Sequence, residues 1–203
     1  MAREVMIIQT GTANTASVMA GLARAGARPL LGVDAEAIRK AERVVLPGVG
    51  ALAAAMGRLD QDGLVEVLRE RVVGGRPTLA ICLGLQLLCQ SSEESPGVAG
   101  LGLISARATR YPDTVLVPQM GWNRVEPDPA CRYLTAGFAY FANSYRLETS
   151  PAGWATARTD HAGPFVAAVE RGDVVACQFH PELSGPWGQA LIERWLTTSG
   201  EAV

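Results

Sequence analysis

The sequence predicts one α/β domain spanning residues 1–203, a three-layer sandwich in which helices cover both faces of a central, mostly parallel or mixed sheet. Three observations lead to this prediction. Short β-rich runs alternate with helical patterns in the first half of the chain, and one of those runs is apolar and continuous. The second half contains mainly short extended runs that Gly and Pro separate. With 48% hydrophobic residues, the chain has ample material for a buried core.

Strands and helices alternate with short links in the first half, a pattern typical of right-handed βαβ units. We expect strands at residues 5–8, 43–46 and 78–81. The last of these, Thr-Leu-Ala-Ile, is the kind of strand that a parallel sheet buries on both faces. We expect helices at 16–24, after a turn and cap at 11–15, at 51–56, at 64–72 before Gly74-Gly75, and directly after Cys82.

Hairpins or a mixed edge of the sheet fit the second half better than further βαβ units. The expected extended runs lie at 115–117, 138–141, 164–169 and 174–179. A final amphipathic helix places Leu191, Ile192, Trp195 and Leu196 on one face. No linker indicates a domain boundary.

Composition excludes several classes of partner and cofactor. Eighteen basic and 20 acidic residues give a net charge of −2, which provides no field for attracting nucleic acid or an anionic membrane. The single lysine, Lys40, is not in a Gly-Lys-Ser/Thr context, so a P-loop is excluded. Because the chain has two histidines and four cysteines without a Cys-x-x-Cys motif, we expect no metal. We expect no dinucleotide cofactor either, since the glycine-rich loop does not contain G-x-G-x-x-G.

The amino-terminal apolar run, Val5 to Ile8, is too short for the core of a signal peptide. The uncharged stretch that continues to Ala23 contains Gln, Thr, Asn and Ser and would not sit in lipid. We therefore expect a cytoplasmic protein with reduced thiols.

Cys82 is the candidate nucleophile. It stands between a buried strand and a helical pattern, so its thiol would project from the carboxyl end of the sheet and face the positive end of the helix, which favours the thiolate. Small residues flank a nucleophile on such a tight turn, and Ala80 and Gly84 occupy those positions. The alternative is that Cys82 is a small core residue at a strand end.

His180 is the candidate base. It ends an apolar run, and Pro181 prevents further pairing of the strand. The carboxylate of Glu182 can turn back to orient the imidazole and stabilise its protonated form. The other histidine, His161, lies in a polar turn, where we expect it to be solvated.

A glycine-rich loop follows the strand at 43–46. Glycine allows peptide orientations that a β-carbon forbids, so an N–H in this loop could point at a ligand. The loop and the amide of Leu83 could form an oxyanion hole, with Gly48, Val49 and Gly50 on the loop side. The alternative is an ordinary strand-to-helix turn.

Three segments carry a resemblance to a known family: Leu46 to Gly50, Ile81 to Gln86, and Gln178 to Glu182. With them the chain resembles the class I, triad-type glutamine amidotransferases, which implies a flavodoxin-like sandwich. Two further segments, Val117 to Asn123 and Tyr140 to Tyr145, look like the glutaminase subunits of imidazole glycerol phosphate synthase. The resemblance runs from Val5 to about Leu196.

The resemblance implies that glutamine is hydrolysed to glutamate and ammonia through a thioester on Cys82, with His180 as acid and base and Glu182 as its orienter. It also implies that glutamine is held by Gly50, Gln86, Ser144 and Tyr145. No cofactor is implied.

The implied partner is a (β/α)₈-barrel cyclase subunit, in a heterodimer. This subunit uses the ammonia to make imidazole glycerol phosphate and an aminoimidazole carboxamide ribotide in histidine biosynthesis. The resemblance further implies low glutaminase activity until the cyclase binds its substrate, with the peptide orientation near Val49 as the switch. Trp122 and Leu183 could belong to the docking surface, although core packing is an equal alternative for Trp122.

The sequence departs from the family pattern in three places, and these limit which family properties can be expected of this chain. Gln9 to Asn14 replaces an Asp and a Gly-Asn turn, Asn143 replaces a His, and Leu183 replaces a Lys or Arg that is expected to help bind the partner. One alternative function is a glutaminase subunit of another synthase, for anthranilate, pyridoxal phosphate or guanylate, although these generally lack the Met-Gly-Trp-Asn segment. The other is a degenerate domain that only binds a partner, against which the complete triad argues.

Overall fold

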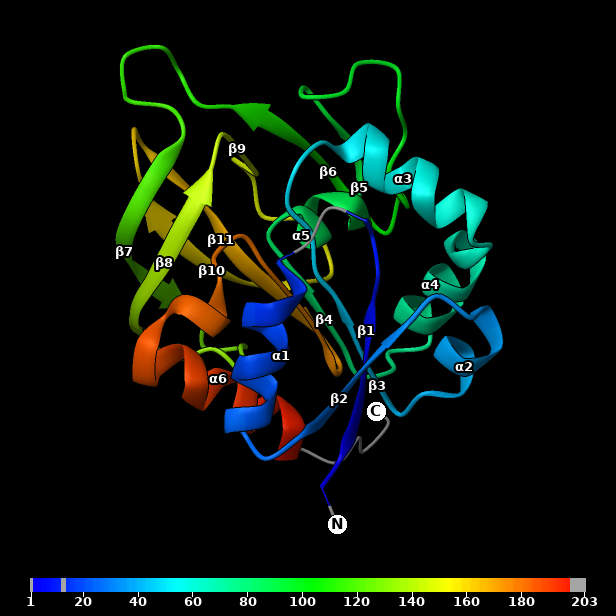
Figure 1. Ribbon diagram of the computed structural model, residues 1–203. Coiled ribbons are helices and arrows are strands. Elements are labelled where there is room, and N and C mark those ends of the chain that lie inside the picture. The colour runs from blue at the N-terminus through cyan, green and yellow to red at the C-terminus, as the bar shows by residue number, and fades with distance from the viewer. Residues whose placement is uncertain (1, 12–13, 198–203) are drawn as a thin grey trace.

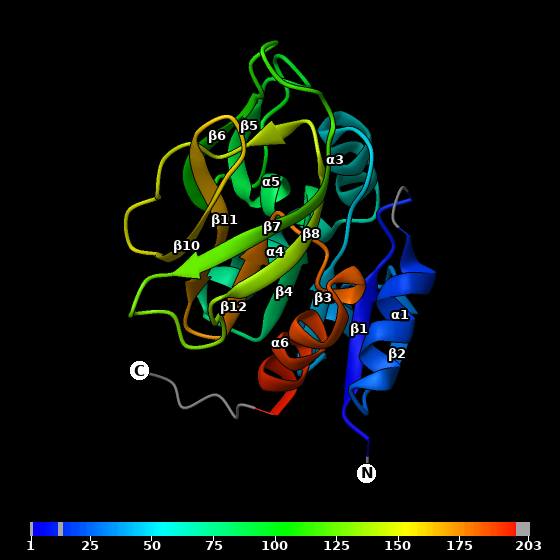
Figure 2. The ribbon, with the colours of Figure 1, turned by 90° about the vertical axis from the view of Figure 1, so that its left-hand side faces the viewer.

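The computed structural model describes residues 2–11 and 14–197, which form a layered α/β structure around a large mixed sheet (Figure 1). Nine strands make this sheet, in the order β2-β1-β3-β4-β12-β11-β10-β7-β8. The bounds are β1 Glu4–Ile8, β2 Arg28–Gly32, β3 Arg43–Leu46, β4 Thr78–Ile81, β7 Gln119–Pro127, β8 Gly137–Asn143, β10 Ala155–Asp160, β11 Pro164–Arg171 and β12 Val174–Cys177. Neighbours from β2 to β12 run parallel, and those from β12 to β8 run antiparallel. Figure 2 shows the β7–β8 pair that ends the antiparallel half.

The helices cover the sheet on both faces. They are α1 Thr15–Arg24, α2 Ala35–Lys40, α3 Leu52–Gln61, α4 Leu64–Val73, α5 Leu83–Leu88, the 3₁₀ helix η1 Pro181–Leu183, and α6 Gly185–Thr197. A small second sheet joins β5 Cys89–Ser92, β6 Ile104–Arg110 and β9 Tyr145–Arg146. Side chains along β3 alternate between two cores: Val45 packs with α1 and α6, and Val44 and Leu46 pack with α2 to α5. The predicted three-layer α/β sandwich is therefore confirmed.

Most elements predicted for the first half are present. The expected helix at 16–24 is α1, whose first turn is capped by the Asn14 side chain, which accepts a hydrogen bond from the Ser17 amide at 3.4 Å. Thr12 and Ala13, in the expected turn, lie outside the described residues. Two short elements, β2 and α2, are not among those predicted from the sequence, and β2 also contains a proline.

The strand expected at residues 115–117 is wrong. The Val115 amide donates to the Pro112 carbonyl in a turn, and β7 begins only at Gln119, after Pro118. Proline cannot donate a backbone hydrogen bond to a neighbouring strand, so pairing starts beyond it. The expected strand at 174–179 is also shorter, since β12 ends at Cys177.

The central pair of strands determines where the site forms. β4 and β12 lie side by side and parallel, with Ile81 opposite Cys177. Because parallel strands end at the same edge of a sheet, the residues that follow them, Cys82 and Gln178, lie next to each other.

Gly84 and Gly57 form a matched pair for testing how tightly the turn after β4 is packed. A β-carbon at Gly84 would collide with the backbone carbonyl oxygen of Leu46, whereas at Gly57, within α3, it would meet no atom within 4 Å. We expect Gly84→Ala to lower the free energy of unfolding by about 3 kcal/mol or more. Gly57→Ala should raise it by about 0.5–1 kcal/mol, since glycine is unfavourable inside a helix.

Urea denaturation of the two variants checks this prediction. A Gly84→Ala protein as stable as the parent chain would contradict the packing described for this turn.

Candidate active site

Cys82 occupies a strained turn between β4 and α5. Its φ and ψ are 55° and −106°, a conformation that costs a non-glycine residue on the order of 1–3 kcal/mol. The Cys82 amide donates to the Cys177 carbonyl at 2.7 Å, and the Leu85 amide donates to the Cys82 carbonyl at 3.0 Å. The backbone on both sides of the thiol is therefore fixed, as the predicted nucleophile turn requires.

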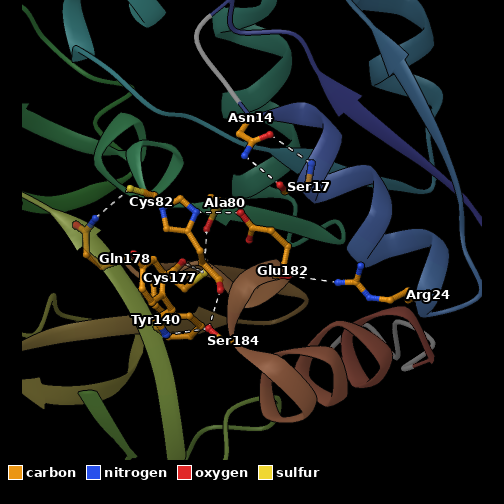
Figure 3. A network of polar contacts seen from close by, with 12 residues as sticks. Asn14, Ser17, Arg24, Ala80, Cys82, Tyr140, Cys177, Gln178, Glu182 and Ser184 are labelled. Atoms are coloured by element: carbon orange, nitrogen blue, oxygen red, sulfur yellow. Dashed lines mark hydrogen bonds and ion pairs between the residues drawn. The ribbon is translucent and has the colours of Figure 1, made fainter. Parts of the chain in front are cut away.

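His180 and Glu182 lie together where the chain passes from β12 to η1. Nδ1 of His180 is 2.9 Å from Oε1 of Glu182, and both side chains are buried. The His180 amide donates to the Tyr140 carbonyl at 2.9 Å, and its carbonyl accepts from the Ser184 hydroxyl at 2.6 Å (Figure 3). With Nδ1 facing Glu182, the other ring nitrogen of His180 is left to interact with Cys82.

The electrostatics of the three side chains favour a charged imidazole. Burial by itself lowers the pKa of His180, but the hydrogen bonds to Cys82 and Glu182 and the negative charge of both groups outweigh it and raise the pKa to about 10. At neutral pH His180 is therefore an imidazolium flanked by Glu182 and Cys82. This arrangement suits an attack by the thiolate and proton delivery by the imidazolium.

A cavity of about 180 Å³ opens beside the thiol. Six of the residues predicted to bind substrate or oxyanion line it: Val49, Gly50, Leu83, Gln86, Ser144 and Tyr145. The structure thus brings together four separate parts of the chain at the cavity: 49–50, 82–86, 94 and 142–145.

Gly48 lies behind this lining and approaches Leu83 closely. A β-carbon on Gly48 would stand 2.7 Å from Cβ of Leu83, so the position requires glycine. The carbonyl of Gly48 accepts a hydrogen bond from the Leu83 amide at 3.3 Å. Because that amide is one of the predicted oxyanion donors, the donor is occupied in this conformation.

Two polar residues on the cavity wall were not assigned a binding role by the sequence. Glu94 follows β5, and its carboxylate accepts a hydrogen bond from the Leu52 amide at the start of α3, at 3.0 Å. Asn143, which replaces the family's histidine, donates to the Tyr111 hydroxyl and to the Tyr145 carbonyl, both at 3.0 Å. Burial raises the pKa of Tyr111 above its ordinary value, so this phenol remains a neutral hydrogen-bonding partner.

The other histidine, His161, is not one of the residues that line the cavity. The His161 ring stands edge-on to Tyr111 with ring centres 5.1 Å apart, and its Nε2 is buried. The expectation of a solvated side chain is therefore wrong, because the turn folds back onto an aromatic residue.

Trp122 is half exposed and packs edge-on to Tyr140, so it is not a core residue. Leu183 is also exposed.

The described residues, 2–11 and 14–197, contain no cluster of three or more His, Cys, Asp or Glu side chains able to hold a metal ion. Within the same ranges, no helix is long and apolar enough to cross a membrane. All four cysteines are free thiols.

Comparison with known proteins agrees with the geometry. The sequence model of the family described as glutamine amidotransferase class-I matches residues 31–198, and the chain belongs to this family. Among its relatives, the imidazole glycerol phosphate synthase subunit HisH of Streptococcus gordonii is 39% identical over 94% of both chains. The subunit of the same name from Methanothermobacter thermautotrophicus is 40% identical, over 95% of this chain and 97% of the relative.

Solved structures with low sequence identity share the fold. A crystal structure of a glutamine amidotransferase superposes with a TM-score of 0.76 at 20% identity, covering 95% of this chain and 96% of the other. PurLQS from Thermotoga maritima superposes with a TM-score of 0.72 at 15% identity, covering 97% and 98%.

The charge of Glu182 should set the alkaline limit of activity. Because Glu182 raises the pKa of His180, Glu182→Gln should move the alkaline limb of the pH profile of kcat from about 10 to lower pH. The loss of kcat at the optimum should be roughly 10-fold, against roughly 100-fold or more for His180→Ala. Glutamate release measured from pH 6 to 11 checks this, and an unchanged alkaline limb in Glu182→Gln would contradict the assignment.

Proposed function

We propose that the chain is the glutaminase subunit of an imidazole glycerol phosphate synthase, acting as a single amidotransferase domain. It hydrolyses glutamine to glutamate and ammonia and supplies the ammonia to a cyclase subunit in histidine biosynthesis. The observation that carries the proposal is the buried Cys82–His180–Glu182 chain, which opens onto a cavity lined by Gly50 and Gln86. The relatives named imidazole glycerol phosphate synthase subunit HisH support the choice of this synthase.

In the proposed reaction, the Cys82 thiolate attacks the side-chain carboxamide carbon of glutamine. The His180 imidazolium gives its proton to the amide nitrogen, which leaves as ammonia while the C–N bond breaks. Neutral His180 then takes a proton from water, whose oxygen attacks the thioester and releases glutamate. Glu182 holds Nδ1 of the ring through both steps and stabilises its charged form.

We assign the cavity to glutamine. Its polar side chains, Gln86, Ser144 and Tyr145, and the loop at Gly50 surround the space beside the thiol. Glu94 adds a carboxylate to the same wall, which suits the α-ammonium group of an amino acid. We therefore add Glu94 to the binding residues that the family resemblance implies.

The oxyanion loop stands in a resting state in this proposal. The Leu83 amide cannot serve an oxyanion while it donates to the Gly48 carbonyl. Turning the peptide between Gly48 and Val49 would release this amide and bring the Val49 N–H inward. Removing one oxyanion donor costs on the order of 10²–10³ in kcat, so the isolated chain should be a slow glutaminase.

Docking of the cyclase is assigned to an exposed apolar surface beside the site, which we call the docking face and define as Met120, Trp122, Phe138 and Leu183. These side chains are between 42% and 68% exposed. Trp122 lies next to α6, where a β-carbon on Gly185 would stand 3.8 Å from its ring. The His180 amide donates to the Tyr140 carbonyl on β8, and the Tyr140 amide donates to the Ser184 hydroxyl, so these two hydrogen bonds connect the docking face to the catalytic segment.

Leu183 replaces the family's cation, so the contact it makes with the cyclase is apolar rather than ionic. The reaction also depends on a reduced thiol, which is maintained in the cytoplasm, and we assign the complex to that compartment.

Activity measurements with and without the cyclase test the function. We expect slow glutamate release by the chain alone and an increase of about 100-fold when the cyclase and its phosphorylated ribulosyl substrate are added. Cys82→Ala should abolish the activity in both conditions. Fast Cys82-dependent hydrolysis without a partner would indicate an uncoupled glutaminase, and no hydrolysis in any combination would indicate a degenerate domain.

A matched pair of variants tests the docking face. Trp122→Ala should weaken cyclase binding by roughly 30-fold, because a tryptophan anchor at an interface is worth about 2 kcal/mol. Leu31→Ala is the control, because Leu31 is exposed to a similar degree as Leu183 but lies on β2, at the opposite edge of the sheet. This variant should leave cyclase binding unchanged. Calorimetric titration of each variant with the cyclase measures both effects, and equal affinities would place the interface elsewhere.

A further inference from the structure

Gln178 is a fully buried polar residue that the proposed reaction does not use. It follows β12 directly, and its side-chain amide points toward Cys82 (Figure 3). Its Nε2 donates to Sγ of Cys82 at 3.6 Å, and its Oε1 accepts a hydrogen bond from Nε2 of Gln86 at 3.2 Å. One amide therefore connects the reactive sulfur to a residue that lines the cavity.

The chemistry of the sulfur sets the direction of this connection. A thiolate accepts hydrogen bonds and cannot donate them, so Gln178 has to turn its NH₂ group toward Cys82. Its carbonyl oxygen then faces Gln86, which has to present its own NH₂ group in return. Gln86 is left with Oε1, to which no side chain or backbone group in the described part of the chain donates.

We propose that Gln178 is a positioning residue that holds the Cys82 thiolate through a hydrogen bond from its side-chain amide and, through Gln86, directs a carbonyl oxygen toward a donor group of the bound glutamine. The substrate end of this assignment rests on the proposed function. The thiolate end does not, because it depends only on the contact between Gln178 and Cys82.

Packing alone does not account for this residue. At this fully buried position an apolar side chain of the same length would fill the space without an amide to satisfy. The amide is retained with a hydrogen bond at each end, and both bonds lead to groups of the site. A role in holding charge, rather than in filling the core, follows from that arrangement.

Two substitutions separate charge from packing. Gln178→Met keeps the length of the side chain and removes the amide, so the pH midpoint for alkylation of Cys82 by iodoacetamide should rise by about one unit. Gln178→Glu keeps the shape and replaces the donor with an acid, so the midpoint should rise further. If Gln178 only filled space, the alkylation midpoint would not rise in Gln178→Met and rise further in Gln178→Glu. Gln90→Met, at an exposed glutamine on β5, is the control and should leave the midpoint unchanged.

The alkylation signal belongs to Cys82 in this experiment. Burial raises the pKa of Cys89 and of Cys131 to about 12 and that of Cys177 well above its usual range, so these thiols stay protonated between pH 5 and 9. Labelling of Cys82→Ala gives the background. In parallel, the KM for glutamine should rise in Gln178→Met, because Gln86 is no longer oriented.

A measurement on the unaltered chain covers the case in which a variant fails to fold. The side-chain ¹⁵N signals of Gln178 should shift with the same pH midpoint as alkylation of Cys82. Midpoints that stay within 0.2 unit in folded Gln178→Met and Gln178→Glu, or Gln178 signals that do not follow Cys82, would overturn the proposal. Alkylation needs neither glutamine nor cyclase, so a failure of the proposed function leaves this test intact.

Discussion

Two parallel strands at the centre of the sheet, β4 and β12, hold the whole site in register. Their pairing sets Ile81 opposite Cys177, and Cys82, the residue that follows β4, donates its amide to the Cys177 carbonyl. The nucleophile and the segment that carries the histidine are thereby brought together across 96 residues of sequence. Since the sheet is buried on both faces by separate cores, neither strand can slide without disrupting both.

Backbone strain and electrostatic charge have different roles in the site that these two strands support. The turn at Cys82 stores backbone strain, and the buried contacts of β4 with its neighbours compensate for it. Glu182 and the sulfur hold a proton on His180 well above neutral pH. The Leu83 amide, by contrast, is occupied by the Gly48 carbonyl. His180 is thus held in its charged form beside Cys82, whereas one predicted oxyanion donor is already engaged by a backbone carbonyl.

The parts of the site that sequence analysis predicted are local. A few consecutive residues are enough to recognise a cysteine between a strand and a helix. The same holds for a His-Pro-Glu segment after a strand. Glu94, the hydrogen bonds of Asn143 and the contacts of Gln178 depend on which segments the fold brings side by side, which no local pattern encodes. The same reason explains the error at His161, whose turn is polar in sequence but packs on Tyr111.

The central claim, an imidazolium held between Cys82 and Glu182, is open to direct measurement, because the chain contains only two histidines. A ¹⁵N NMR titration of the imidazole rings resolves them, with His180→Ala assigning the signals. The account predicts that His180 is protonated at pH 8 and titrates near pH 10, and that Cys82→Ala moves this transition toward the ordinary histidine value of about 6.5. A His180 ring that is already neutral at pH 8 in the unaltered chain would contradict it.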